Sequence, residues 1–311
     1  MPDINYRTIC IVNPVAGNGK SEQRWGAIDK VLRREGFQYD VEITRHSGHA
    51  SQIARAALQK GYDRIVAVGG DGTLNEVVNG LFTDEGEVIN SSAGLLLIPV
   101  GTGSDFARMF DIDSSLGCVL KLMSLKEAKK CDVIRASFYG HNGQKALRYY
   151  INIADVGIGS ETCARVNRGS KRLGGFWSFL LAALYTIITY HNRQLTVVID
   201  DKEIYQGPSC LVAAGNGRFF GGGMKIAPEA RVDDGVLDVV IVKDFTKLEL
   251  FANMAKVYRG AHLQHPKVEL GRGTRVNIKT AEKAYLELDG EPVGYGNTEL
   301  QVLPAAIKIM F

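Results

Sequence analysis

The chain has 311 residues, about twice the size of a common domain, so two domains are expected. Hydrophobic residues make up 45% and charged residues 23%, which excludes a disordered or fibrous chain. The net charge of +3 is too small to indicate a nucleic-acid partner, although it is compatible with anionic ligands or a lipid surface.

The first 130 residues alternate between strand-like and helix-like segments. Short apolar runs that fit strands buried on both faces occur at 8–12, 65–68 and 95–98, and 39–44 also reads as a strand. Apolar residues at helical spacing occur at 25–32, 51–58, 74–81 and 106–110. This alternation predicts an α/β domain, in which helices cover both faces of a parallel sheet.

The pattern changes near residue 130, after which few helices are expected. Strand-like segments lie at 131–139, 148–153, 195–200, 209–214, 235–242, 275–280, 284–288 and 306–311. Successive strands with few helices between them predict an antiparallel sheet or β-sandwich, and therefore a second, all-β domain. The edge strands of such a sandwich can pair between copies, so a homodimer is one open alternative.

Residues 173–190 form a largely apolar segment that follows the basic residues Arg165, Arg168, Lys171 and Arg172. A membrane span usually needs about 20 predominantly apolar residues, whereas this segment also contains Gly, Ser and Thr. We therefore expect no transmembrane span. The first interpretation is a buried helix of the second domain, and the second is an amphipathic face that enters lipid beside the basic cluster.

The cysteine pattern indicates a reducing compartment. The five cysteines are an odd number, are widely spaced and include no C-x-x-C pair. The segment from Met1 to Arg7 contains charged residues and no apolar run, so it is not a signal peptide. We expect an intracellular, cytoplasmic protein.

Three glycine-rich segments follow predicted parallel strands. They are 13–17, 69–73 and 101–105. Exits of this kind place bare backbone N–H groups at the start of a helix, where they bind phosphate together with the helix dipole. One such turn is weak evidence, because glycine also suits any tight turn, but three at successive strand ends predict a phosphate site.

Two common nucleotide motifs are excluded. Gly19-Lys20-Ser21 ends like a Walker A loop, but the first glycine of that motif would fall at Pro14. No G-x-G-x-x-G follows a strand, so a Rossmann dinucleotide site is not supported either.

Asp71 stands among the glycines of the second exit. A carboxylate there would repel phosphate unless a cation lies between them, so a divalent metal is the functional interpretation. The alternative is that Asp71 only caps the helix that follows.

Two acidic turns occur in the second half. Arg231 to Asp238 contains two adjacent carboxylates ahead of a strand, and it is either a hairpin turn or a site for a hard cation. Leu288-Asp289-Gly290-Glu291 is a strand that runs into an acidic turn, in which a carboxylate could act as general base. A simple turn explains either composition equally well.

Together these motifs resemble the diacylglycerol kinase catalytic-domain superfamily, and within it the soluble bacterial lipid kinases. The matching segments are 13–17, 69–76, 99–107, 233–238 and 288–291, in the same order over nearly the whole chain. Gly-Gly-Asp-Gly-Thr alone also occurs in NAD kinases and phosphofructokinases. One departure is Ser104, which stands where this superfamily usually has asparagine in Gly-Thr-x-Asn-Asp.

The resemblance implies an α/β ATP-binding domain over residues 1–130, joined by a C-terminal strand at about 303–311. It also implies a β-sandwich lipid-substrate domain over 131–302, with the active site in the cleft. The residues it implies for ATP binding are Asn13, Pro14, Val15, Ala16, Gly17, Thr44, Gly69, Gly70, Asp71, Gly72, Thr73, Leu74, Asn75, Glu76, Gly101 and Thr102.

The resemblance further implies two Mg²⁺ ions. Asp71 would act through the catalytic ion, supported by Asp105 and Asp132. Arg231, Asp234 and Val236 match a structural Mg²⁺ site, to which Arg231 and Val236 would give backbone carbonyls. Glu291 matches the proton acceptor, and Asp289 beside it remains the other candidate for that role.

The implied reaction is transfer of the γ-phosphoryl group of ATP to the hydroxyl of diacylglycerol, by an enzyme peripheral to the inner face of the membrane. Phosphatidylglycerol, ceramide and sphingoid bases remain open as acceptors. A kinase of soluble NAD and a non-catalytic nucleotide-binding regulator are two further alternatives.

Overall fold

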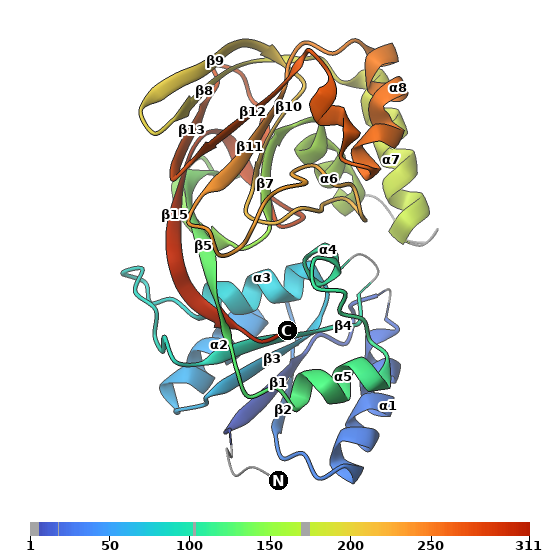
Figure 1. Cartoon of the computed structure of the whole chain (residues 1–311), viewed down its shortest axis with the longest axis vertical. Helices are drawn as coiled ribbons and strands as arrows, with labels where there is room; N and C mark the ends of the chain where they lie inside the picture. The colour runs from blue at the N-terminus through green and yellow to red at the C-terminus, as the bar shows by residue number, and fades with distance from the viewer. Residues whose placement is uncertain (1–5, 18, 102–103, 169–174) are drawn as a thin grey trace. The chain divides into compact units, whose positions relative to one another are not determined.

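The computed structural model describes residues 6–17, 19–101, 104–168 and 175–311. It divides into two compact units (Figure 1). The first unit comprises Met1–Cys131 and Ala305–Phe311, and the second comprises Asp132–Pro304. Each unit is described by itself below.

The first unit is built on a parallel sheet in the order β4-β3-β1-β2. Its strands are β1 (Thr8–Val12), β2 (Asp40–Ile43), β3 (Arg64–Gly69) and β4 (Gly94–Pro99). Every residue of β1, β3 and β4 is buried, which explains why these strands read as continuous apolar runs. The edge strand β2 is largely exposed.

Helices cover both faces of this sheet (Figure 1). They are α1 (Ser21–Arg34), α2 (His49–Gln59), α3 (Asp71–Gly80), α4 (Asp105–Arg108) and α5 (Leu116–Met123). Trp25 and Leu32 of α1 pack with Val119 and Leu122 of α5 against one face of the sheet. Helices α2 and α3 pack together and contact β1 and β3. The predicted α/β architecture is confirmed, although α5 was not expected.

The second unit is dominated by antiparallel strands. They are β5 (Lys129–Gly140), β6 (Lys145–Tyr150), β7 (Ile153–Gly157), β8 (Arg193–Ile199), β9 (Lys202–Ser209), β10 (Leu211–Gly215), β11 (Leu237–Val242), β12 (Val268–Gly273), β13 (Arg275–Lys279), β14 (Tyr285–Leu288) and β15 (Glu291–Ile309). One row of strands runs β12-β11-β10-β7-β14-β15. Strand β15 also begins a second row, in which it pairs with β13 and β5. From β13 the pairing continues to β8 and β9, and from β5 it continues to β6. A single apolar core joins side chains from both rows, so the predicted β-sandwich is confirmed.

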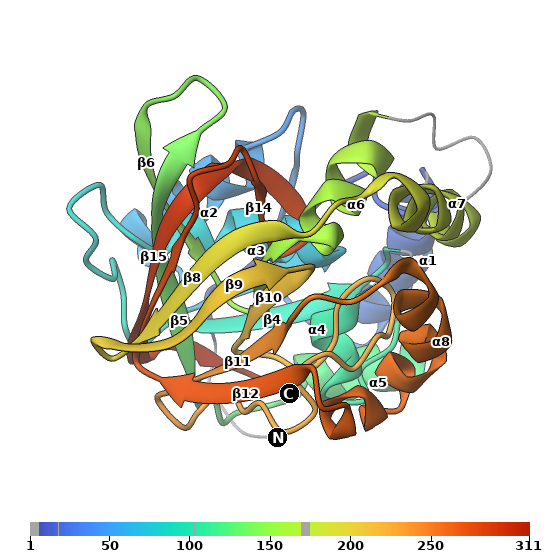
Figure 2. The same cartoon turned by 90° about the horizontal axis from the view of Figure 1, so that it is seen from above.

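The second unit contains more helices than the one expected over 173–190. Helices α6 (Ile158–Arg168), α7 (Gly175–Thr189) and α8 (Lys247–Tyr258) and the 3₁₀ helix η2 (Ala261–Gln264) all belong to the second unit. Viewed from above, α7 and α8 lie on the same side of the strands (Figure 2). Leu250 and Val257 of α8 pack against a cluster that includes Cys210 and Val240, on the face of β10 and β11 turned away from the sandwich core.

The apolar segment 173–190 is also different from its first interpretation. Its described side chains do not form a fully buried helix, because Thr186 and Ile187 are buried whereas Leu181, Tyr185 and Ile188 are exposed. Along the described chain, no helix combines the length and apolar character needed to cross a membrane. Lys171 and Arg172 of the basic flank, and the side chain of Arg168, lie outside the described residues.

Strand β15 links the two units. Its first residue, Glu291, pairs with Leu288 of β14, and its end runs parallel to β4, where Lys308 pairs with Gly94 and Ile309 with Leu95. The side chain of Ile309 is 4% exposed, so the end of strand β15 completes the sheet and the core of the first unit.

This packing predicts that Ile309→Ala lowers the free energy of unfolding by about 2–5 kcal/mol, because it leaves a cavity beside β4. Urea denaturation of the full chain measures the change. The neighbouring half-buried Lys308→Ala is the matched control and should shift the free energy by less than about 1 kcal/mol. Equal effects of the two substitutions would contradict the role given to the C-terminal strand.

Candidate functional site

The three glycine-rich exits of the first unit meet at the carboxyl ends of β1, β3 and β4. A Cβ on Gly17 would lie 2.5 Å from the carbonyl oxygen of Val100, and Gly17 has φ +60°. A Cβ on Gly101 would lie 2.8 Å from the Cα of Gly70. Side chains at Gly17 and Gly101 would therefore hold the loops apart, and glycine is needed because the backbones touch.

Side chains also join the first exit to the second. The amide of Asn13 donates to Thr73 Oγ1 at 3.0 Å, and its Oδ1 accepts the N–H of Val15 at 3.2 Å. Thr73 is buried, so this bond is protected from water. The sequence placed both residues in a phosphate site, and the structure brings these two exits together.

Asp71 does not cap the helix that follows it, so the capping interpretation is wrong for α3. Gly70 is the N-cap of α3, and Asp71 is its first residue. Its carboxylate instead accepts the N–H groups of Asp105 at 2.8 Å and Phe106 at 3.1 Å, at the start of α4. Asp71 thus ties the second exit to the third.

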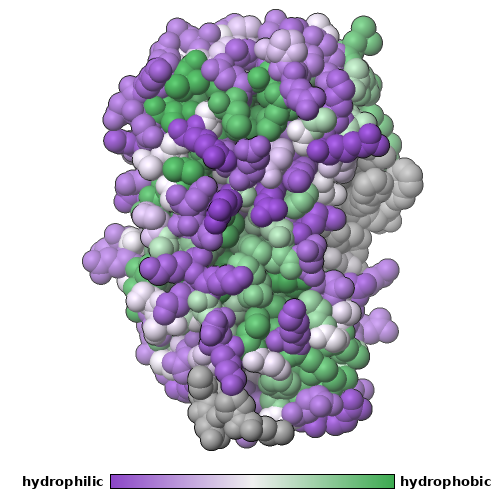
Figure 3. Space-filling model, in the orientation of Figure 1, coloured by the Kyte–Doolittle hydropathy of each residue, from purple (hydrophilic) through white to green (hydrophobic). Residues whose placement is uncertain are grey.

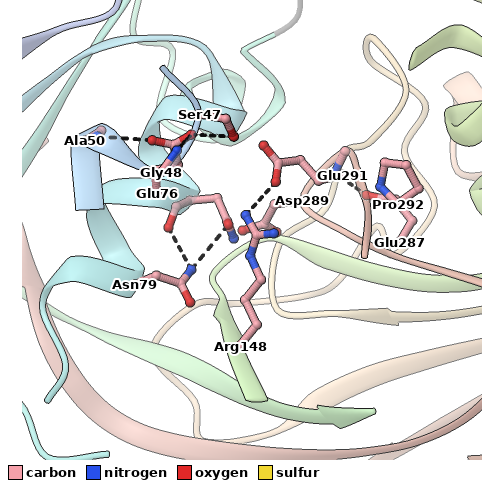
Figure 4. Close-up of polar contacts among 12 residues, drawn as sticks. Ser47, Gly48, Ala50, Glu76, Asn79, Arg148, Glu287, Asp289, Glu291 and Pro292 are labelled. Carbon is pink, nitrogen blue, oxygen red and sulfur yellow. Dashed lines mark hydrogen bonds and ion pairs between the residues drawn. The ribbon is translucent and has the colours of Figure 1, made fainter. Parts of the chain in front are cut away.

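Glu76 performs the same task for another helix. Its two oxygens accept the N–H of Gly48 at 2.8 Å and of Ala50 at 3.1 Å (Figure 4). These donors stand at the start of α2, whose N-cap, Gly48, has no side chain to accept them. The carboxylate predicted to contact ATP is therefore bonded to the backbone of α2.

The other predicted ATP-contacting positions differ in their exposure. Val15 is exposed, whereas Leu74 and Asn75 are buried within α3. Thr44 follows β2, and its N–H donates to the carbonyl of Val12 at 2.9 Å. Thr102 lies outside the described residues.

In the second unit, Asp289 and Gly290 form the two-residue turn between β14 and β15. Both residues have positive φ, at 48° and 85°, as the Asp-Gly sequence of a tight hairpin requires. The Asp289 carboxylate accepts three backbone N–H groups at 2.9–3.1 Å, from Ile151, Asn152 and Ile153. Asp289 therefore fixes this turn to the segment between β6 and β7.

Glu291 is the first residue of β15 and forms an ion pair with Arg148. The distance from Arg148 Nη2 to Glu291 Oε2 is 2.5 Å (Figure 4). The Glu291 side chain retains 33% of its exposure, so its carboxylate is aligned by Arg148 and still accessible. Sequence analysis missed Arg148, because more than a hundred residues separate the two partners along the chain.

A buried acid pair lies beside this turn. Asp155 and Glu287 are opposed in register on β7 and β14, and they are 1% and 5% exposed. Glu287 accepts the N–H of Gly290, and Asp155 Oδ1 accepts the N–H of Ser160 at 2.7 Å. Burial raises the pKa of both carboxyls, and the charge of Asp155 raises the pKa of Glu287 further. Two buried acids in contact are stabilised by a shared proton.

The other acidic turn is held by Asp132. The carboxylate of Asp132 accepts the N–H of Gly235 at 2.7 Å, and its own N–H donates to Val232. Asp234 Oδ1 accepts the N–H of Val236 at 3.3 Å, and the guanidinium of Arg231 pairs with Asp233 at 3.2 Å. Asp132, assigned to the catalytic metal by resemblance, is thus bonded to this turn.

The carboxylates suit Mg²⁺ in one particular way. Over the described residues, no group of three or more His, Cys, Asp and Glu side chains converges to hold a metal ion. Mg²⁺ is commonly held by one or two carboxylates together with phosphate oxygens and water. The N–H of Asp105 donates to the carboxylate of Asp71, so the two acids lie close together. They fit that arrangement as the two carboxylates that the protein would provide.

Comparisons with known proteins agree with this fold and these motifs. Residues 7–136 match the family model described as the diacylglycerol kinase catalytic domain. Residues 152–311 match the model described as the YegS C-terminal NAD kinase beta sandwich-like domain.

Whole-length relatives extend the match. A protein of Pseudomonas aeruginosa named "Probable lipid kinase YegS-like" is 31% identical over 89% of this chain and 86% of that protein. A Staphylococcus carnosus protein named "Diacylglycerol kinase" is 28% identical over 92% of this chain and 88% of that protein.

Solved structures share the fold. A Bacillus anthracis crystal structure titled as a diacylglycerol kinase has a TM-score of 0.72 and 21% identity, covering 100% of this chain and 98% of that one. An Archaeoglobus fulgidus NAD kinase in complex with ATP has a TM-score of 0.53 and 13% identity, covering 98% and 93%.

An α/β unit whose glycine-rich strand ends converge, joined to a β-sandwich, is therefore the fold that the chain shares with these solved structures. The chain belongs to the diacylglycerol kinase family, in the branch that carries the YegS-type C-terminal domain.

The buried acid pair makes a prediction about pH. The pKa of Glu287 is raised well above its ordinary 4.5 in the folded state. As the pH rises above that ordinary value, the unfolded chain loses the proton and the folded chain keeps it. The free energy of unfolding should therefore fall with rising pH until the folded pKa is passed.

Glu287→Gln should remove this component, because an amide donates to Asp155 without titrating. Urea denaturation from about pH 5 to pH 8 should show the stability of the variant rising relative to the parent. Exposed Glu203→Gln is the matched control. A difference between Glu287→Gln and parent that does not change with pH would argue against the shared proton.

Proposed function

We propose that this protein is an ATP- and Mg²⁺-dependent lipid kinase that transfers the γ-phosphoryl group to the hydroxyl of diacylglycerol, forming phosphatidic acid. The observation that carries the proposal is the convergence of three glycine-rich strand ends in the first unit. The names of the relatives, which include lipid kinases and diacylglycerol kinases, support the acceptor class.

The first unit is assigned to ATP. Gly17, Gly70 and Gly101 bring bare backbone together, and such backbone can approach phosphate oxygens closely. Asp71 keeps the start of α4 in place through its bonds to Asp105 and Phe106. Rigid placement of this kind provides much of the rate in phosphoryl transfer, because the reaction needs positioning and charge neutralisation more than covalent chemistry.

Glu291 is assigned as the general base. Its carboxylate takes the proton of the acceptor hydroxyl as that oxygen forms a bond to the γ-phosphorus. The bond from the γ-phosphorus to the bridging oxygen breaks, and ADP leaves with that electron pair. Asp289 is 5% exposed and accepts three backbone N–H groups, whereas a third of the Glu291 side chain is exposed, which favours Glu291 as the base and a positioning role for Asp289.

The metal assignments follow the donor sets. Mg²⁺ bound with ATP neutralises phosphate charge, and Asp71, supported by Asp105 and Asp132, would hold that ion. Asp234, with the backbone carbonyls of Arg231 and Val236, would hold a structural Mg²⁺ at the other acidic turn. The bond between Asp132 and Gly235 supports the rigidity of that turn.

The acceptor lies in a bilayer, so the enzyme would work as a peripheral protein at the cytoplasmic face of the membrane. Phosphatidylglycerol, ceramide and sphingoid bases carry hydroxyls of similar chemistry and remain the competing acceptors. A non-catalytic nucleotide-binding regulator is the alternative outside enzymes, and the aligned, accessible carboxylate of Glu291 favours catalysis over it.

The decisive assay incubates the protein with labelled ATP and a panel of these lipids. Glu291→Gln should lower kcat by about 10²–10⁴-fold and leave ATP affinity nearly unchanged, because the amide cannot accept the proton. Asp71→Ala should abolish transfer, because it removes both the proposed metal ligand and the two hydrogen bonds that hold the start of α4. Removal of Mg²⁺ with a chelator should abolish transfer in the parent.

Exposed Glu85→Gln serves as the matched control and should keep full activity. Transfer to ceramide or a sphingoid base but not to diacylglycerol would replace the acceptor within the same mechanism. A parent that binds ATP and phosphorylates no lipid of the panel would rule out the proposed reaction in favour of the regulator.

A second prediction concerns Arg148. Replacing it by methionine removes the ion pair that aligns Glu291, so kcat should fall by about tenfold or more while KM for ATP stays near the parent value. Steady-state kinetics separate the two parameters. A variant that raises KM for ATP alone would contradict an aligning role.

A further inference from the structure

The second unit carries a helix whose outer face is apolar. On α8, Leu248, Phe251 and Tyr258 are 81%, 42% and 44% exposed, and Ala252 and Ala255 between them are exposed as well. These residues follow helical spacing, so they form one stripe. Leu250 and Val257 pack inward, so the helix is apolar on its buried side and again on its solvent side.

Helix α7 repeats this feature next to α8. Leu181, Tyr185 and Ile188, spaced four and three residues apart, are 52%, 56% and 57% exposed. The two helices are in contact, and the ammonium of Lys247 on α8 donates to the carbonyl of Ile188 on α7. Both views place the helices side by side (Figures 1 and 2). Hydrophobic residues gather at the right-hand edge of the space-filling view near α8 (Figure 3).

Six large apolar side chains exposed on two adjoining helices exceed what scattered surface residues explain. Contiguous apolar surface of this kind usually marks an interaction site. We call it the α7–α8 surface, and it consists of Leu181, Tyr185, Ile188, Leu248, Phe251 and Tyr258.

Two cations stand at the end of this surface. Lys256 and Arg259 line a cavity of about 440 Å³ together with Ala255, Gln264 and His265. No ion pair involves either cation in the part of the chain that the structure describes. The acid of the same helix, Glu249, is paired with Lys267 at 2.8 Å. This end of α8 therefore carries positive charge that its own acid does not balance.

We propose that the α7–α8 surface docks on a bilayer that contains anionic phospholipid, with the apolar side chains in the headgroup–acyl boundary and a lipid phosphate held by Lys256 and Arg259. The inference takes its membrane from the lipid acceptor of the proposed function. Exposed Leu and aromatic side chains bordered by Lys and Arg are the composition of helices that lie in the membrane interface. An anionic leaflet attracts such cations.

Charge favours this occupant over a second copy of the chain. In a twofold dimer the patch would meet a second copy of itself, which offers apolar side chains and cations but no acid to pair with Lys256 and Arg259. Like charges at an interface oppose association, whereas phosphate headgroups complement them. A bilayer therefore fits both the apolar and the charged part of the surface.

Co-sedimentation with sucrose-loaded vesicles tests the proposal. The parent should bind vesicles of phosphatidylcholine mixed with phosphatidylglycerol more tightly than vesicles of phosphatidylcholine alone. Leu248→Ser with Phe251→Ser should weaken binding to the mixed vesicles by about tenfold or more, because less apolar surface enters the lipid. Lys256→Ser with Arg259→Ser should remove most of the preference for phosphatidylglycerol.

Leu116→Ser with Lys202→Ser is the matched control, since both residues are exposed and lie outside the surface. It should bind as the parent does. Thermal unfolding of each variant verifies that it is folded. Turnover of a short-chain, water-soluble diacylglycerol should stay within about twofold of the parent in the surface variants, because that substrate needs no bilayer.

A parent that ignores anionic vesicles, or surface variants that bind them as the parent does, would overturn the proposal. Surface variants that change the oligomeric state in analytical ultracentrifugation and leave vesicle binding intact would assign the face to a second copy instead. Vesicle binding that depends on the surface, by a protein that phosphorylates no lipid, would uphold the surface and reject the proposed function.

Discussion

The first unit depends on how closely its strand ends approach one another. The loops after β1, β3 and β4 touch through backbone, with no room for a Cβ at Gly17 or Gly101. Because the loops are in contact, short side-chain bonds such as Asn13 to Thr73 can join them. The resulting surface is backbone-rich, and an anion can approach N–H groups there without meeting side chains.

Several carboxylates among the candidate site residues bind backbone amides. Asp71 does so at the start of α4, Glu76 at the start of α2, and Asp289 beneath its own hairpin. Each holds segments that are distant in sequence, and charged acceptors make such bonds stronger than neutral ones. Glu291 differs, because its partner is the guanidinium of Arg148 and a third of its side chain remains exposed. That difference separates a candidate base from acids that position the chain.

Local pattern predicted the first unit better than the second. Strands such as β3 are buried at every residue, so composition alone locates them, and glycine marks their exits. Asp155 and Glu287 form a pair only because β7 and β14 align in one register, which no local pattern records. Helix α6 was missed because its sequence is mostly polar, and α8 because apolar residues lie on both of its sides. The direction of Asp71 toward α4 likewise depends on tertiary contact.

The α7 segment shows why pattern could not choose between burial and lipid contact. Both interpretations predict an apolar helix, and α7 has a buried side and an exposed apolar side, since Thr186 and Ile187 are buried while Ile188 is exposed. Helix α8 has the same two-sided character, with Leu250 inside and Leu248 outside. One apolar face is needed to cover β10 and β11, and folding gains nothing from the other. A second apolar face on two adjoining helices, bordered by Lys256 and Arg259, therefore requires an explanation outside folding, and a charged lipid surface provides one.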